Sequence, residues 1–191
     1  WLDLKDRIFG KGLLDLRDDE AREAAAMIRG RGLGVYCLSS GLFHADVEQG
    51  HERFAAGLCD RVERLVDLAG LLQPRVVRLL GATTSRGVAG GALLSGVAER
   101  HFWLIEEYRR AIDRIAAAGF MATIENETRG CVLASPGDVR LLFDLIDRPG
   151  KVMFTWDAQN MWQCGTWPSV EVYEELRDLT GYVDFKGGRS A

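Results

Sequence analysis

The chain has 191 residues, of which 47% are hydrophobic, and 28 acidic against 24 basic residues give a net charge of −4. This composition suits one domain with a substantial core, and the acidic balance without long blocks of one sign argues against a nucleic-acid partner. No apolar run approaches the roughly 20 residues that span a bilayer, and no segment has the pattern of a signal peptide. The four cysteines form no CxxC pair. These features together predict a cytoplasmic protein without a membrane segment.

Short apolar runs that predict buried strands alternate with helical patterns along the chain. The predicted strands are 1–4, 33–38, 75–80, 120–124, 152–156 and 182–183. The predicted helices run from residue 18 or 19 to 28, and over 48–68, 99–118, 135–146 and 168–179. This alternation, with nearly continuous apolar strands, predicts a parallel sheet covered by helices. The Gly-rich stretch 83–96 follows a strand and predicts a mobile loop at the functional mouth.

Two architectures fit this alternation. A (β/α)8 TIM barrel typically needs about 250 residues, so the six strand–helix units would represent it incompletely. Residues 1–191 would then form a single barrel domain that lacks the first strand and the last strand–helix units. An open doubly wound sheet is the alternative and fits the length without missing units.

Three acidic residues, Glu125, Asp157 and Asp184, each follow a predicted strand. A lone carboxylate at the end of a buried strand is costly to desolvate unless it has a partner. In a barrel the strand ends converge on one mouth, and the carboxylates would converge with them. This pattern predicts a divalent cation held by the three carboxylates. For Asp184, a loop cap or a salt bridge to Lys186 or Arg189 is the alternative.

Three further residues are candidates for contact with a substrate. Arg78 and Lys186 offer positive charge for an anionic or hydroxylated substrate, and a structural ion pair at the barrel mouth is the alternative for both. His44 follows a predicted strand on the loop side, where barrel active sites lie. A solvated loop histidine is the alternative for this residue.

Five segments in this order resemble motifs of the xylose isomerase-like barrels, the sugar phosphate isomerase/epimerase superfamily. The first is 3–5 followed by 10–16, which read DLK and GKGLLDL. The others are 77–81, 124–127, 156–160 and 183–187, which read VRLLG, IENE, WDAQN and VDFKG. Together they extend over nearly the whole chain, and they occur at the spacing of successive barrel units. The resemblance therefore implies a TIM barrel of this superfamily.

The resemblance implies a divalent metal bound by Glu, Asp, His and a second Glu. Glu125 and Asp157 match the first two positions, Asp184 stands at the histidine position, and the second glutamate has no counterpart in this sequence. A carboxylate in place of an imidazole favours Mn²⁺ or Mg²⁺ over Zn²⁺. Glu125 is also the candidate for the catalytic base that removes a proton next to a carbonyl. Asn160 stands where the superfamily places a substrate-binding side chain.

The implied function is a metal-dependent isomerase or epimerase that acts on a small keto-sugar, polyol or hydroxy-keto acid. A homo-oligomer is compatible with this function. One alternative is an inosose-type dehydratase or lyase on the same scaffold. Another is a catalytically degenerate barrel that serves as a binding or scaffold protein. The apurinic-site endonuclease branch needs a histidine-rich zinc cluster and a basic face, and three scattered histidines argue against it.

Overall fold

The computed structural model of the chain describes residues 1–5, 7–86, 93–128 and 130–186. Its main sheet contains six parallel strands in the order β1-β4-β5-β6-β7-β8. An antiparallel pair, β2 and β3, follows β1. The strands span β1 Leu2–Leu4, β2 Arg7–Ile8, β3 Lys11–Gly12, β4 Val35–Ser39, β5 Val76–Leu80, β6 Met121–Glu125, β7 Val152–Asp157 and β8 Thr180–Asp184. All six predicted strands are therefore confirmed.

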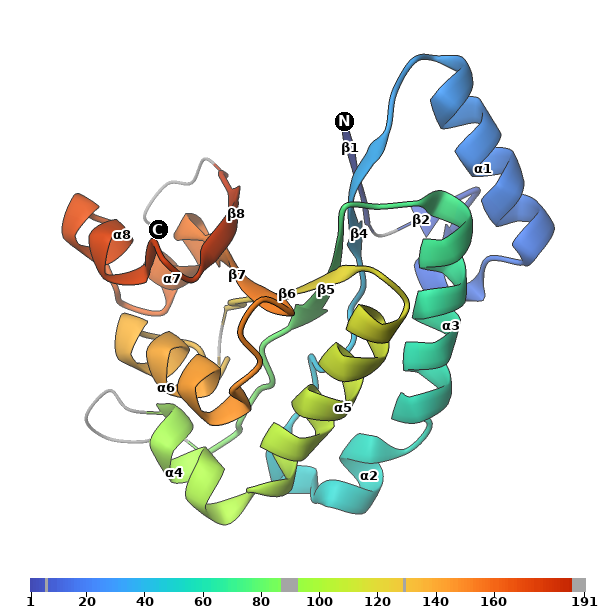
Figure 1. Cartoon of the computed structure of the whole chain (residues 1–191). Coiled ribbons are helices and arrows are strands. Elements are labelled where there is room, and N and C mark those ends of the chain that lie inside the picture. Colours follow the sequence, from blue (N-terminus) through green and yellow to red (C-terminus); the bar gives the residue numbers. More distant parts are fainter. Residues whose placement is uncertain (6, 87–92, 129, 187–191) are drawn as a thin grey trace.

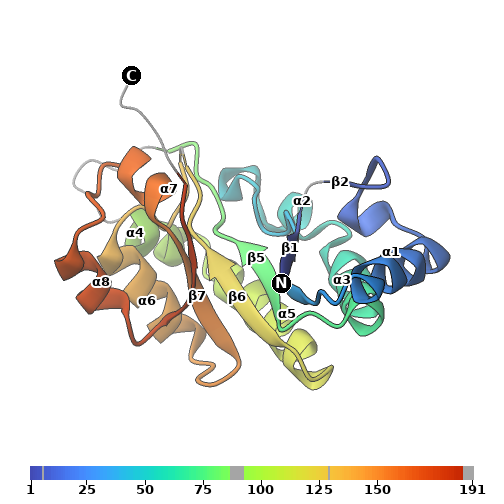
Figure 2. The ribbon, with the colours of Figure 1, turned by 90° about the horizontal axis from the view of Figure 1, so that it is seen from above.

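The sheet is curled into part of a barrel, with helices along its outer side (Figures 1 and 2). β1 and β8 are the two ends of the sheet, and the curl brings them toward each other. The ring of Tyr182 on β8 lies 5.1 Å from the ring of Tyr36 on β4, and the Lys5 ammonium lies 3.6 Å from the Asp184 carboxylate. The predicted incomplete (β/α)8 barrel is confirmed, and the open doubly wound alternative is wrong.

Helices connect the strands, as the sequence predicts. In the order α1, α3, α5, α6 and α8, neighbouring helices pack side by side around the curled sheet. Among the described residues, none of the helices combines the length and apolar character required to traverse a bilayer. The helices span α1 Asp18–Gly30, α2 His51–Ala55, α3 Leu58–Leu72, α4 Leu93–Arg100, α5 Trp103–Ala117, α6 Pro136–Ile146, α7 Ala158–Gln163 and α8 Val170–Leu176, with 3-10 turns η1 Leu13–Asp15 and η2 Val47–Gln49.

Several helix boundaries differ from the prediction. The single helix predicted over 48–68 is wrong, because Gly50 and Gly57 adopt positive φ angles of 88° and 66° and divide the segment into η2, α2 and α3. The helix predicted over 99–118 begins only at Trp103, since α4 is a separate helix. Part of the predicted loop 83–96 belongs to α4, and residues 87–92 of that loop lie outside the described residues.

Side chains alternate between the two faces of the sheet. Apolar residues such as Ile124 and Phe154 are fully buried against the helices, and each contributes roughly 1.5–3 kcal/mol through burial. Polar residues contact one another across the concave face, where Thr123 Oγ1 lies 2.5 Å from Thr155 Oγ1. The concave face is therefore polar toward the carboxyl ends of the strands, where barrel active sites lie.

Candidate metal centre and adjoining cavity

Three carboxylates meet at one edge of the sheet. Glu125, Asp157 and Asp184 are the last residues of β6, β7 and β8. One oxygen from each carboxylate lies within 4.8 Å of one oxygen from each of the others. Glu125 and Asp157 are buried, whereas the Asp184 side chain is 18% exposed. The structure thus has the predicted convergence, and the metal role of the three residues stays a prediction.

Glu125 has one satisfied and one unsatisfied oxygen. Its Oε2 accepts a hydrogen bond of 2.5 Å from Arg78, and its Oε1 is buried without a hydrogen-bond partner among the described residues. Burial raises the pKa of Glu125 to about 7, although the guanidinium of Arg78 opposes the shift. Buried polar atoms are nearly always paired in folded proteins. The free oxygen is therefore available to a cation or a proton donor.

Asp157 is held firmly at the end of β7. Its Oδ1 accepts the backbone N–H of Asn160 at 2.9 Å and so caps α7, and its Oδ2 accepts a hydrogen bond from Lys186. The side chain of Asn126 donates to the Asp157 carbonyl and accepts from its N–H, both at 2.9 Å. Asn126 was not a predicted site residue. The sequence does contain a signal for it, since Asn126 directly follows Glu125 at the end of the strand. An amide side chain in that position can both donate and accept hydrogen bonds.

Positive charges face the three carboxylates. Lys186 Nζ lies 3.5 Å from Asp184 Oδ2 in addition to its contact with Asp157, and Lys5 Nζ lies 3.6 Å from the same Asp184 oxygen. Burial alone would lower the pKa of Lys186, but the hydrogen bond and charge of Asp157 and the charge of Asp184 raise it above its ordinary value. The salt bridge considered as the alternative for Asp184 is therefore present with Lys186.

A cavity of about 770 Å³ lies at the same rim, although its described lining does not include any of the three carboxylates. Arg78 lines this cavity while it contacts Glu125, and its buried Nε has no partner among the described residues. Glu127 also lines it, and Glu127 Oε2 accepts from Asn160 Nδ2 at 3.4 Å. Cavities of this size with a few convergent polar groups are typical small-molecule sites. Further polar lining residues are Asp15, Ser39, Ser40, Asp60, Arg61 and Arg64.

The structure gathers most of the predicted substrate-binding residues but not all of them. Arg78 and Lys186 contact the carboxylates directly. Asn160 is buried in α7 and also donates to the Asn126 carbonyl at 3.1 Å, so it links the ends of β6 and β7. His44 is exposed in the loop after β4 and is not among the residues that line the cavity. Its role in substrate binding stays a prediction without support from this geometry. Arg189, the other partner considered for Asp184, lies outside the described residues.

The donor set fits a hard divalent cation. All three side chains offer carboxylate oxygens, which are the ligands that Mg²⁺ and Mn²⁺ prefer. The unpaired Oε1 of Glu125 gives such an ion a buried oxygen that no described group occupies. Lys186 contacts Asp157 Oδ2 and Asp184 Oδ2, so these two oxygens become free for an ion when the contacts of Lys186 change.

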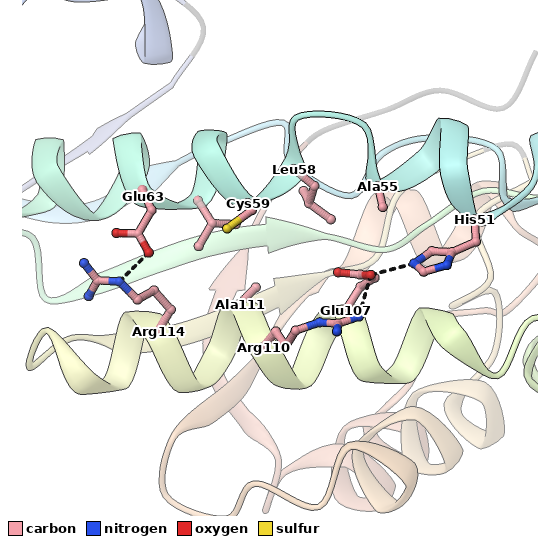
Figure 3. Close-up of a pocket in the computed structure, with 10 residues that line it drawn as sticks. His51, Ala55, Leu58, Cys59, Glu63, Glu107, Arg110, Ala111 and Arg114 are labelled. Atoms are coloured by element: carbon pink, nitrogen blue, oxygen red, sulfur yellow. Dashed lines mark hydrogen bonds and ion pairs between the residues drawn. The ribbon is translucent and has the colours of Figure 1, made fainter.

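A second cavity, of about 450 Å³, lies between α3 and α5 on the outer side of the barrel (Figure 3). Its charged residues pair with one another: Arg114 donates to Glu63 at 2.6 Å, and Glu107 contacts His51 at 2.7 Å and Arg110 at 2.6 Å. No buried polar side-chain atom of the described lining lacks a partner. We call this region the helix groove, and we place the candidate site at the rim instead.

Solved structures identify the fold. No protein-family model matches the chain, and no curated protein matches its sequence. A xylose isomerase-like TIM barrel protein from Mycobacterium smegmatis, solved in complex with magnesium, superposes with a TM-score of 0.67 at 17% identity, covering 91% of this chain and 58% of that one. The fold is that of the xylose isomerase-like TIM barrels.

Two further structures with this barrel are enzymes by name. A 3-keto-D-glucoside 4-epimerase from E. coli has a TM-score of 0.66 at 16% identity and covers 87% of this chain and 64% of that one. A probable 3-DHS dehydratase from Bacillus anthracis has a TM-score of 0.64 at 16% identity. It covers 86% of this chain and 55% of that one. The chain thus spans less than two thirds of the length of these barrels.

Proposed function

We propose that this protein is a divalent-metal-dependent isomerase or epimerase that moves a proton next to the carbonyl of a small carbohydrate-like molecule. The observation that carries the proposal is the convergence of Glu125, Asp157 and Asp184 at the carboxyl end of a xylose isomerase-like barrel. Structures with this barrel include an epimerase for a keto-glucoside and a protein that holds magnesium. We propose Mn²⁺ or Mg²⁺ as the preferred ion, with Zn²⁺ as the competing candidate.

Each rim residue has a proposed role. Glu125, Asp157 and Asp184 would hold the cation, which would supply Lewis-acid polarisation of the substrate carbonyl. Glu125 is also the proposed catalytic base, because its buried carboxylate ends β6 beside the proposed cation. Arg78 lines the proposed substrate cavity and would donate a hydrogen bond to a hydroxyl or anionic group.

The geometry supports the remaining predicted contacts unequally. Lys186 and Asn160 lie beside the carboxylates and would orient the substrate. His44 is retained as an outer contact, although it lies in a solvent-exposed loop. A cytoplasmic location remains part of the proposal, since the four cysteines form no CxxC pair. We expect neither a nucleic-acid partner nor a membrane partner, and a homo-oligomer remains compatible.

The proposal is tested by metal titration and proton exchange on the same protein. Isothermal titration with Mn²⁺ is expected to give one site per chain, and a panel of small keto-sugars in D₂O, with D-fructose as the first probe, is expected to include one that gains deuterium next to its carbonyl. Asp157→Asn should weaken Mn²⁺ binding at least about 100-fold, because it removes a charged ligand. Glu107→Gln in the helix groove is the matched control and should change nothing. A wild-type protein that stays metal-free at millimolar Mn²⁺ would contradict the proposal.

One observation favours a non-enzymatic alternative. Arg78, Lys186 and Lys5 already face the three carboxylates, as they would in a purely structural ion cluster. A scaffold protein of this kind would bind no Mn²⁺ and exchange no proton. A dehydratase on the same scaffold would bind Mn²⁺ but release water from its substrate, which the NMR spectrum of the product distinguishes from epimerisation.

A further inference from the structure

The ammonium group of Lys186 lies among the oxygens that the proposed cation would use. Its Nζ donates to Asp157 Oδ2 and lies 3.5 Å from Asp184 Oδ2. The side chain is 38% exposed and comes from a position two residues beyond the end of β8. Lys186 therefore reaches the carboxylates from the solvent side and can leave them without disturbing the sheet.

We propose that Lys186 is a built-in counter-ion, which holds the carboxylates together in the metal-free protein and moves away when a divalent cation binds. The inference rests on the proposed function, because it presupposes a cation at these oxygens. The ammonium and a cation that share the Asp157 carboxylate would lie within a few ångströms of each other. At that separation their repulsion inside a partly buried site is strong, and only one of them can remain.

The two lysines near the site differ in a way that allows a matched comparison. Lys186 contacts both Asp157 and Asp184, whereas Lys5 lies near Asp184 alone, at 3.6 Å. Their side chains are almost equally exposed, at 38% and 39%. Removal of either lysine deletes one positive charge, but only removal of Lys186 frees an oxygen of the buried Asp157. The metal affinity should therefore depend much more on Lys186 than on Lys5.

The test is isothermal titration with Mn²⁺ alone on the wild type and on the variants Lys186→Met, Lys186→Arg and Lys5→Met. Lys186→Met is expected to bind Mn²⁺ at least about 10-fold more tightly, because a neighbouring like charge is removed. Lys5→Met should stay within about 3-fold of the wild type, and Lys186→Arg should resemble the wild type because it keeps the charge. In thermal melts without metal, Lys186→Met should unfold at a lower temperature than the wild type, and saturating Mn²⁺ should remove that difference.

The outcomes separate this inference from the proposed function. Equal or weaker Mn²⁺ binding by Lys186→Met, with normal binding by the wild type, would overturn the inference and leave the metal site standing. Equal gains for Lys186→Met and Lys5→Met would also overturn it, since they indicate a general charge effect. If neither the wild type nor Lys186→Met binds Mn²⁺ while both melt cooperatively, the proposed function itself fails. A crystal structure with Mn²⁺ in which Lys186 no longer contacts Asp157 would support the exchange directly.

Discussion

The rim and the helix groove both combine carboxylates with basic side chains beside a cavity, yet they differ in how the charges are satisfied. In the groove, Glu63 is 45% and Glu107 is 12% exposed, and both pair with arginine or histidine side chains that are about 40–65% exposed. At the rim, Glu125 and Asp157 are at most 1% exposed, and one Glu125 oxygen has no partner among the described residues. Exposed pairs contribute little to stability, whereas buried charges demand partners. An unsatisfied buried acceptor therefore marks a candidate site better than the cavity itself.

The largest difference is expected from removal of the two arginines that face these carboxylates. Arg78→Met leaves Glu125 buried without its partner and should lower the free energy of unfolding by about 3–5 kcal/mol at pH 8. Arg114→Met removes the partner of the exposed Glu63 and should have no measurable effect. Urea denaturation of both variants measures the contrast. The double variant Arg78→Met with Glu125→Gln should recover most of the loss, and equal effects of the two single variants would contradict the comparison.

Metal binding at the rim should stabilise the folded protein, and a substitution in the helix groove should not change this stabilisation. At a Mn²⁺ concentration 100 times the Kd, the free energy of unfolding should rise by about 2.7 kcal/mol. Asp157→Asn should abolish this gain, because Asp157 is one of the three converging carboxylates. Glu107→Gln, the groove control, should keep the full gain. Thermal melts with and without Mn²⁺ provide the measurement, and a gain that survives in Asp157→Asn would place the ion elsewhere.

The pH dependence of metal binding should report on Glu125. The pKa of this carboxyl is raised to about 7 by burial, so the folded metal-free protein holds a proton there below that pH. The cation has to displace this proton, and the Mn²⁺ affinity should fall about 10-fold for each pH unit below 7 and level off above it. Titrations between pH 5.5 and 8.5 test the prediction. A flat profile would show that Glu125 does not take part in binding.

The smallest effect is expected from the coupling within the groove. A double-mutant cycle on Glu63 and Arg114 should give at most about a fifth of the coupling energy between Arg78 and Glu125, because solvent screens the exposed pair. Urea denaturation of the single and double variants supplies both numbers. Similar coupling in the two pairs would remove the physical distinction between groove and rim.

The strands and their terminal carboxylates could be predicted from sequence because both are local signals. A short apolar run that ends in Glu125, Asp157 or Asp184 is visible without any knowledge of tertiary structure. The barrel order then brings the three ends to one edge, and the structure has that convergence. The incomplete barrel could also be predicted from sequence. Its motifs resemble those of xylose isomerase-like barrels and occur in the same order along the chain.

The rest of the rim could not be predicted because it depends on contacts between distant segments. The bonds from Asn126 to Asp157 join positions 31 residues apart, and the contact of Lys186 with Asp157 spans 29 residues. The six-residue helix α7 is too short to show a periodic pattern, and its start depends on the Asp157 cap. The division of the helix predicted over 48–68 depends on the left-handed conformation of Gly57, which apolar spacing does not reveal.

The most direct test of the account is a crystal structure of the protein soaked with Mn²⁺, with anomalous scattering recorded at the manganese edge. We predict one anomalous peak at the rim, about 2.0–2.6 Å from oxygens of Glu125, Asp157 and Asp184. A peak in the helix groove, or no peak at the rim at a saturating Mn²⁺ concentration, would contradict the account.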